Sequence, residues 1–425
     1  MPKQYTNQNH QSMPKSIIAL LITCLTFSFQ SYAQETKTED LKIFLDCNVC
    51  DSTFMRQNLG IVQFVRDQGL SDVHLFFVTQ RNGSNGRSYE IDFIGKNEFE
   101  NINYKLEFST DSNMTSDDVR RRILEYVKLG LVRFWIAKGN IADVSVSVPS
   151  PETETNNTVV KDPWNYWVFR IGANGFFNGQ ESNNSSNLNF NISARRVTEK
   201  NKFSLRLGFS ENKSTFTFDG EDIVAINNNK SLNISDVLSI NDHWSYGLFG
   251  NIGTSTYSNY DFFWRLKPGL EYNFFKYQES ANKQLILSYR NGIVFNNYIE
   301  RSIFGEEKEH LFQHSILLGG SVRQEWGNIN GEASFNQYLH DTELHSFGFF
   351  LGANVRLFKG FNFNISGNYR ITRDQINLPA GDVSLEELLL QQQQLQSGYN
   401  YFVSVGFSYQ FGSIYNSIVN PRFNF

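Results

Sequence analysis

The sequence predicts an all-β transmembrane antiparallel barrel of about 12 strands, an even number as this class requires, preceded by a small α+β domain. Three observations predict it: long period-two alternation after residue 164, a high aromatic content, and helical periodicity concentrated before residue 140. Aromatic residues make up 15% of the 425 residues, with 39 Phe and 19 Tyr, while charged residues make up only 19%. Mean hydropathy is nevertheless −0.39. This combination fits strands that are apolar on alternate residues only.

The N-terminus has the features of an export signal. Lys15 precedes an apolar run at 16–29, and the small-x-small sequence at 31–33 follows as a cleavage site. We therefore expect residues 1–33 to be a signal peptide, with Met13 as an alternative start. The apolar run is too short to span a bilayer comfortably.

Two cysteines, Cys47 and Cys50, remain after the expected cleavage. In an oxidising compartment a disulfide between them is the first interpretation. A redox-active pair and a zinc site are the alternatives, but no second pair of ligands stands at zinc spacing. Asp46 and Asp51 flank the thiols, and neighbouring carboxylates disfavour a reactive thiolate. These residues favour a structural disulfide.

Residues 40–140 predict a compact α+β domain in the order β-α-β-β-β-α. Asp51 is the expected N-cap of the first helix, and Thr115 with Asp118 resembles a capping box before the second. The segment 149–162 is polar, contains two prolines and predicts a linker. The expected elements are strands at 42–45, 72–79, 88–96 and 104–109, a helix at 51–67, and a helix that begins at Thr115.

From 164 to 413 apolar and polar residues alternate, which predicts the barrel strands. A soluble β-sandwich also alternates, but these strands are long and carry charges in the middle of their polar face. In a barrel such charges face a wet lumen while the aromatic side chains face lipid. The lumen-facing candidates are Arg170, Arg195, Arg206, Arg265, Lys267, Glu271, Arg290, Arg323, Glu325, Glu332, Arg356 and Arg370.

Short and long connections are expected to alternate along the barrel, as tight periplasmic turns and longer outer loops do in this class. A short helix is expected at 384–396, within the last long loop. The tight turns are expected at 198–202, 241–242, 327–328 and 359–360, and the long loops at 179–187, 218–230, 299–309 and 375–398.

The C-terminal strand carries a family resemblance. Its aromatic alternation from Tyr401 to Phe411, with Phe425 at the end of the chain, resembles the assembly signal of bacterial outer-membrane β-barrels. The segment 414–425 departs from that pattern and is expected to be a tail. The resemblance covers 164–413. It implies an outer-membrane barrel with the N-terminal domain in the periplasm, and it implies membrane lipid, the barrel assembly machinery and a possible periplasmic protein as partners.

No catalytic set is expected. Outer-membrane phospholipases use a Ser-His-Asn set, and His314 with Ser315 is the nearest candidate pair. Adjacent residues of a strand point to opposite faces, so these two side chains cannot interact. His243 and Ser245 share a face but lie at a turn. Polar residues of the lumen or the interface are the simpler interpretation of all four.

No metal, cofactor or nucleic-acid site is expected either. His340, Asp341, Glu343 and His345 have loose spacing and fit a solvated hairpin tip better than a metal site. A formal charge of −5 without a basic run disfavours nucleic acid as a partner.

Three functions remain open from the sequence. The first is a passive or gated solute channel in which the lumen arginines contribute anion selectivity. The alternative role of these arginines is to pair with Glu271, Glu325 and Glu332 and fill the interior of the barrel. The second is a non-enzymatic envelope anchor that presents the N-terminal domain to a periplasmic partner. A lipid-acting enzyme is the third.

Overall fold

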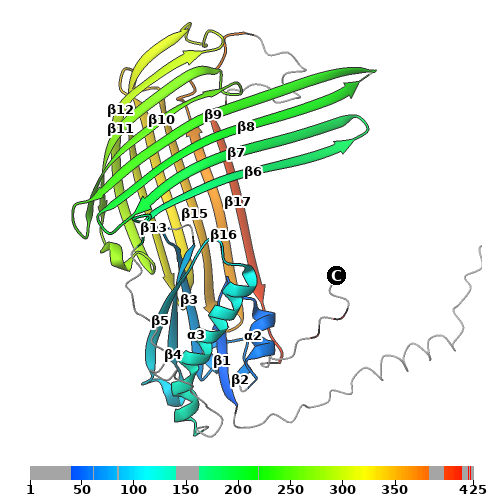
Figure 1. Cartoon of the computed structure of the whole chain (residues 1–425), viewed down its shortest axis with the longest axis vertical. Helices are drawn as coiled ribbons and strands as arrows, with labels where there is room; N and C mark the ends of the chain where they lie inside the picture. The colour runs from blue at the N-terminus through cyan, green and yellow to red at the C-terminus, as the bar shows by residue number, and fades with distance from the viewer. Residues whose placement is uncertain are drawn as a thin grey trace, which may run out of the picture. The chain divides into compact units, whose positions relative to one another are not determined.

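The computed structural model describes residues 40–60, 62–83, 86–139, 162–218, 220–381, 397–413, 420 and 422. The expected signal peptide, most of the expected linker, the expected helix at 384–396 and nearly all of the C-terminal tail lie outside these residues. In the described ranges, no helix is both long and apolar enough to cross a membrane. Two sheets organise this part of the chain, one of five strands and one of twelve (Figure 1).

The five-stranded sheet belongs to the α+β domain. Its order is β2-β1-β3-β4-β5, with β1 parallel to both β2 and β3 and the remaining pairs antiparallel. Its strands are β1 (Leu41–Asp46), β2 (Val62–Phe64), β3 (Val73–Arg81), β4 (Arg87–Gly95) and β5 (Asn103–Thr110), and its helical elements are α2 (Ser52–Asn58), η1 (Gln68–Leu70), η2 (Asn97–Phe99) and α3 (Ser116–Ala137).

The first predicted helix is shorter than expected. Asp51 caps it by accepting a hydrogen bond from the Phe54 N–H at 2.9 Å, but α2 ends at Asn58. The segment that follows forms β2, because Val62 lies in parallel register with Leu41 and is buried with it. The expected order therefore lacked one short strand. Cross-strand pairing outweighed the helical spacing of the apolar residues here.

The long helix α3 covers the small sheet (Figure 1). Thr115 and Asp118 form the predicted capping box at its start. The buried face of α3 includes Val127 and Phe134, which join the core of the domain. Gly130 lies over the ring of Phe93, and a Cβ at that position would meet the ring at 1.9 Å. The helix therefore approaches the sheet at a distance that only glycine permits there.

The twelve-stranded sheet is an up-and-down meander in which every strand pairs with the next one in sequence, all antiparallel. This confirms the predicted strand number. No pairing joins β6 to β17 in the described residues, so the row has two free edges. The strands are β6 (Trp167–Gln180), β7 (Asn183–Val197), β8 (Asn201–Phe218), β9 (Glu221–Ser239), β10 (Trp244–Ser255), β11 (Tyr260–Asn273), β12 (Lys283–Tyr298), β13 (Lys308–Gln324), β14 (Gly327–Tyr338), β15 (His345–Phe358), β16 (Phe361–Thr372) and β17 (Tyr399–Tyr409), with the short η4 (Tyr277–Glu279) before β12.

Two of the predicted long loops are strands. The segments 179–187 and 218–230 form the ends of the β6–β7 and β8–β9 pairs, and because β7 also pairs with β8 here, the four strands β6 to β9 extend together (Figure 1). The first segment contains only Gly and polar residues, and the second places Ile223, Val224, Ala225 and Ile226 in a row, so the apolar alternation that predicts strands is missing from both. Backbone hydrogen bonds between neighbouring strands hold this extension together where the alternation is missing. The segment 299–307 is the connection between β12 and β13, as expected.

Candidate functional site

The two faces of the large sheet differ sharply in chemistry. The apolar face leaves large hydrophobic side chains exposed, for example Leu207 at 43%, Leu266 at 45% and Phe407 at 75%. The opposite face, the polar face, carries Arg, Lys, Glu, Asn, Ser and Gly residues. A sandwich would bury the apolar side chains between two sheets. Because they are exposed here, the arrangement is that of a barrel wall.

The strand register shows on which face of the large sheet each lumen-facing candidate lies. Arg206 lies opposite Ser193 and Asn233, and Arg290 lies opposite Gly269 and Ser315. Following such pairs across the sheet puts all but one of the candidates on the polar face. Glu325 is different, because it lies in the turn between β13 and β14. The candidates on the polar face are Arg170, Arg195, Arg206, Arg265, Lys267, Glu271, Arg290, Arg323, Glu332, Arg356 and Arg370.

Five of these cations line one hollow on the polar face, with a volume of about 520 Å³. We call it the basic hollow. Its other lining residues are neutral, and they include Ser204, Asn251 and Phe249. The cations come from β7, β8, β11 and β12, and they are Arg195, Arg206, Arg265, Lys267 and Arg290.

A second hollow of about 450 Å³ adjoins the first and shares Arg290 and Phe249 with it. Three polar groups form a hydrogen-bonded chain in its lining. The Ser245 hydroxyl donates to the Tyr277 hydroxyl at 3.0 Å, and the Tyr277 hydroxyl donates to the Glu271 carboxylate at 3.0 Å. Tyr277 belongs to η4, so a short connecting segment reaches into the wall of this hollow.

The residues considered for hydrolytic chemistry have other partners. The His243 ring donates from Nδ1 to the carbonyl oxygen of Asn273 at 2.7 Å. His314 lies on the apolar face with its Nε2 3.0 Å from Gln337 Oε1, while the neighbouring Ser315 lies on the polar face. Neither of the two candidate pairs, His243 with Ser245 and His314 with Ser315, is therefore brought together in the structure.

The hairpin tip at 339–344 holds His340, Asp341 and Glu343, and His345 begins β15. His345 Nδ1 donates to the carbonyl oxygen of Thr342 at 2.9 Å. Across the described ranges, no group of three or more His, Cys, Asp or Glu side chains has the geometry to hold a metal ion.

The segment 373–381, which we call the inward loop, folds against the polar face. Ile376 is 2% exposed and packs with Val294, Leu311 and Tyr338, which lie on β12, β13 and β14. Asn259 Nδ2 donates to the carbonyl oxygen of Asn377 at 3.0 Å. Further hydrogen bonds join the loop to 301–303. The inward loop therefore covers part of the polar face from β12 to β14, and β12 is also one of the strands that line the basic hollow.

Sequence reasoning missed a cluster of charged groups that joins the α+β domain to the turns of the large sheet. Arg356 Nη1 lies 2.8 Å from Asp46 Oδ2, and Lys96 Nζ lies 2.9 Å from Glu325 Oε2. His74, which is fully buried, lies between the two acids, with Nε2 3.2 Å from Asp46 and Nδ1 3.4 Å from Glu325. The one signal in the sequence of the described residues was His74, a histidine within the apolar part of β3.

These contacts lower the pKa values of the two acids in the cluster, Asp46 and Glu325. Burial alone would raise the pKa of Asp46, but hydrogen bonds from His74 and Arg356 outweigh burial and hold the pKa below its usual value. Hydrogen bonds from His74 and Lys96 lower the pKa of Glu325 to about 2, against the opposing effect of burial. Both carboxylates are therefore charged at neutral pH.

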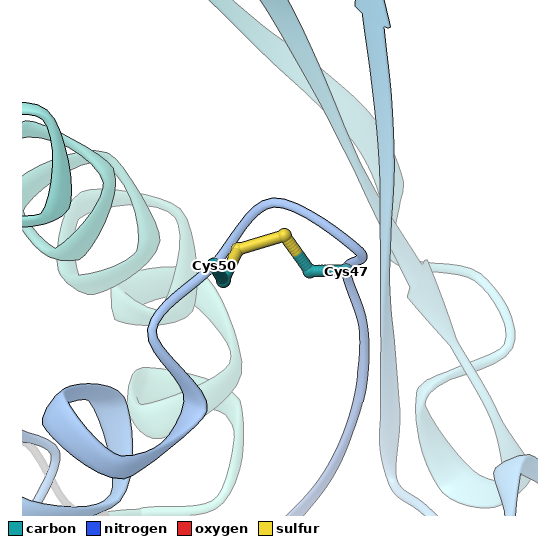
Figure 2. Close-up of a disulfide and its surroundings, with 2 residues drawn as sticks. All are labelled: Cys47 and Cys50. Atoms are coloured by element: carbon teal, nitrogen blue, oxygen red, sulfur yellow. A yellow bond between two sulfur atoms is a disulfide. The ribbon is translucent and has the colours of Figure 1, made fainter. Parts of the chain in front are cut away.

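Cys47 and Cys50 are joined in a disulfide in the turn between β1 and α2, with Cα atoms 5.6 Å apart (Figure 2). The turn follows Asp46 directly. The disulfide therefore fixes the backbone beside a residue that contacts the large sheet.

The fold and these sites define a class of protein: a twelve-stranded antiparallel barrel wall with a charged polar face, preceded by a small α+β domain. No family model matches the chain, and no curated protein matches it. Two solved structures match the chain. One is a NanC porin, which is 10% identical, with 57% of this chain and 98% of that chain covered and a TM-score of 0.28. The other is the translocator domain of the autotransporter NalP from Neisseria meningitidis, which is 12% identical, with 58% of this chain and 87% of that chain covered and a TM-score of 0.26. At these TM-scores the likeness does not bear on function, and the architecture rests on the strand pairing above.

Proposed function

We propose that this chain is an outer-membrane β-barrel that forms a solute channel with a preference for anions. The exposed apolar face is the observation that carries the membrane assignment. Large hydrophobic side chains such as Leu248 at 41%, Leu270 at 43% and Phe312 at 58% recur on alternate residues of successive strands. A soluble surface rarely exposes apolar area on that scale, whereas a bilayer covers it.

Spanning a bilayer requires that the two free edges, β6 and β17, be paired. An unpaired backbone group in hydrocarbon costs several kcal/mol, so an open edge is not tolerated there. Pairing of β6 with β17 closes the wall, and the polar face then becomes the lumen. Disulfide cross-linking of cysteines introduced one at a time along β6 with one on β17, in protein refolded in lipid, tests this closure.

The anion preference rests on the charges of the basic hollow. Five cations line it and no carboxylate does. A ring of fixed positive charge in a lumen lowers the energy of entering anions and raises that of cations. The inward loop packs on β12 to β14, so solute passage is expected past it along the wall from β7 to β11, which carries four of the five cations.

The α+β domain is proposed to gate this channel from the periplasmic side. It contacts four separate segments at the ends of the large-sheet strands: 282, 325, 356–360 and 412. These contacts favour a domain held at the turns over one presented freely to a distant partner. The anchor function remains the second candidate, and it needs no conductance.

Single-channel conductance of the refolded protein in a planar bilayer tests the proposal. We expect discrete steps with anion preference, which shift toward cations when Arg206→Glu and Arg265→Glu are combined. Arg121→Glu, an exposed position on α3, serves as the control because it lies outside the large sheet. Steps that appear only after removal of residues 34–150 would assign the gate to the α+β domain. Silence of both forms, in protein shown to be folded, would leave the anchor function.

A further inference from the structure

The basic hollow brings together residues that are distant in sequence. Arg195 lies beside Ser204 on the neighbouring strand, and Arg206 lies opposite Ser193. On the other side of the hollow, Arg290 pairs across from Gly269 and Lys267 pairs across from Phe249. The meander thus brings positive charges from two strand pairs, β7–β8 and β11–β12, to the lining of the basic hollow.

Four of the five cations have no ion-pair partner in the described ranges, and they are Arg206, Arg265, Lys267 and Arg290, although Glu271 of the adjoining hollow attracts Arg290 electrostatically. By contrast, Arg356 near the end of β15 and Arg301 in the β12–β13 connection each form an ion pair. Like charges around one hollow repel each other, and the low-dielectric wall of a barrel strengthens that repulsion. An anion bound in the hollow offsets this repulsion between the cations, and the relief of repulsion adds to the free energy of binding.

The cationic groups are also held in place. The Arg290 guanidinium stacks over the Phe249 ring at 3.8 Å from its centroid, and the Arg265 guanidinium lies 4.9 Å from the centroid of Phe263. Lys267 donates a hydrogen bond to Gln313. A stacked guanidinium keeps its edge N–H groups available, and these suit the oxygens of carboxylate, phosphate and sulfate. Fixed donors of this kind reduce the entropy lost on binding.

We propose that the basic hollow is a binding site for a small oxyanion carrying two or more negative charges, such as a phosphorylated or polycarboxylated solute. This inference rests on the proposed channel function and deepens it, because it assigns a saturable site inside the lumen. Its volume of about 520 Å³ suits a small solute and its hydration water. Monovalent anions compensate fewer of the charges and bind more weakly.

Calorimetric titration of the refolded full-length chain with sulfate, against chloride at matched ionic strength, tests the site. We expect saturable sulfate binding with one site per chain and at least tenfold preference over chloride. Combining Arg206→Gln with Arg265→Gln should weaken sulfate binding about 100-fold, since each charge-assisted contact contributes about tenfold. Arg370→Gln, on the polar face but outside the hollow, should bind as the parent does.

Sulfate binding no tighter than chloride, or equal weakening by Arg370→Gln, overturns the site. A second measurement guards against misfolding: sulfate should raise the melting temperature of the parent and not that of the double variant. Conductance separates this inference from the channel proposal. Sulfate binding without conductance overturns the channel and leaves the site, whereas anion-selective conductance without sulfate binding overturns the site alone.

Discussion

Replacing Asp46 with Asn should loosen the α+β domain from the large sheet without unfolding either. Asp46 is the acid that Arg356 and His74 share, at 2.8 and 3.2 Å. Asparagine has nearly the same shape and still accepts a hydrogen bond, but it carries no charge. The variant therefore removes the charge assistance from both contacts and leaves their geometry intact.

The expected cost follows from burial. The Asp46 side chain is 17% exposed and that of Arg356 is 28% exposed, so the pair is only partly screened by water. A hydrogen bond to a charged group contributes roughly 1.5–3 kcal/mol, and Arg356 recovers part of this by hydration, which leaves a loss of about 2 kcal/mol. That loss corresponds to about a 30-fold larger population of the detached state.

Hydrogen exchange at the β15–β16 turn measures this population. The Gly360 N–H donates to Asp67 Oδ2 at 3.1 Å, so this amide is protected only while the domain is attached. Exchange at Gly360 should become about 30-fold faster in Asp46→Asn. Glu107→Gln is the control, because its ion pair with Lys105 lies on an exposed surface. Unchanged exchange at Gly360 in folded Asp46→Asn would refute the assigned role of Asp46.

Three further predictions concern other parts of the chain. Gly130→Ala should destabilise the α+β domain by about 1–3 kcal/mol in urea unfolding, because the added methyl group meets Phe93 and this outweighs the gain in helix propensity. Ile376→Ala should loosen the inward loop at a local cost of about 2–4 kcal/mol and give larger, noisier conductance steps. The Glu325 pKa of about 2 lies below its ordinary 4.5, so its contribution to domain attachment is complete above pH 4.5 and is lost as pH falls toward 2. Hydrogen exchange of the Gly360 amide in the β15–β16 turn, corrected for intrinsic rates, should therefore show full protection at pH 5 and weaker protection at pH 3.

Each of these has its own control. Leu129→Ala, at an exposed position of α3, should leave the urea transition unchanged. Leu357→Ala, on the apolar face, should leave the conductance steps as they are. A Glu325→Gln variant should lose the protection at pH 5, and an unchanged pH profile in that variant would contradict the assignment.

Local and periodic features were predictable from the sequence. The capping box at Thr115 depends on residues three apart, so it needs no tertiary information. The polar face was predictable because a strand alternates with period two, and eleven of the twelve charged candidates follow that period. Glu325 continues the spacing of Arg323 but falls beyond the end of β13, in the turn before Gly327, the first residue of β14, which adopts a φ of 140°.

Features that depend on pairing between distant segments were not predictable. Which arginines converge in the basic hollow follows from the register of β7 to β12, and the sequence of each strand alone does not give that register. His74 and Glu325 are about 250 residues apart, so their contact leaves no local pattern. The strand β2 exists because Val62 pairs beside β1, although its spacing suited a helix.

In the proposed outer-membrane barrel, the length of the β8–β9 pair sets how far the protein reaches from the lipid. β8 has 18 residues and β9 has 19, while a tilted strand needs roughly 9–11 to cross the hydrocarbon layer. The excess of about eight residues, at about 3.3 Å each, makes an extension roughly 25 Å long, along which β7 stays paired with β8. Asn227, Asn228 and Asn229 lie at the base of this extension, level with the end of β10, and its outer part carries the exposed Val224 and Ile226 beside acidic residues. With the α+β domain on the periplasmic side, as proposed, an antibody or phage approaching the cell would meet this extension before the barrel rim, and a peptide tag inserted at its tip near Gly220 would be displayed there without touching the lumen.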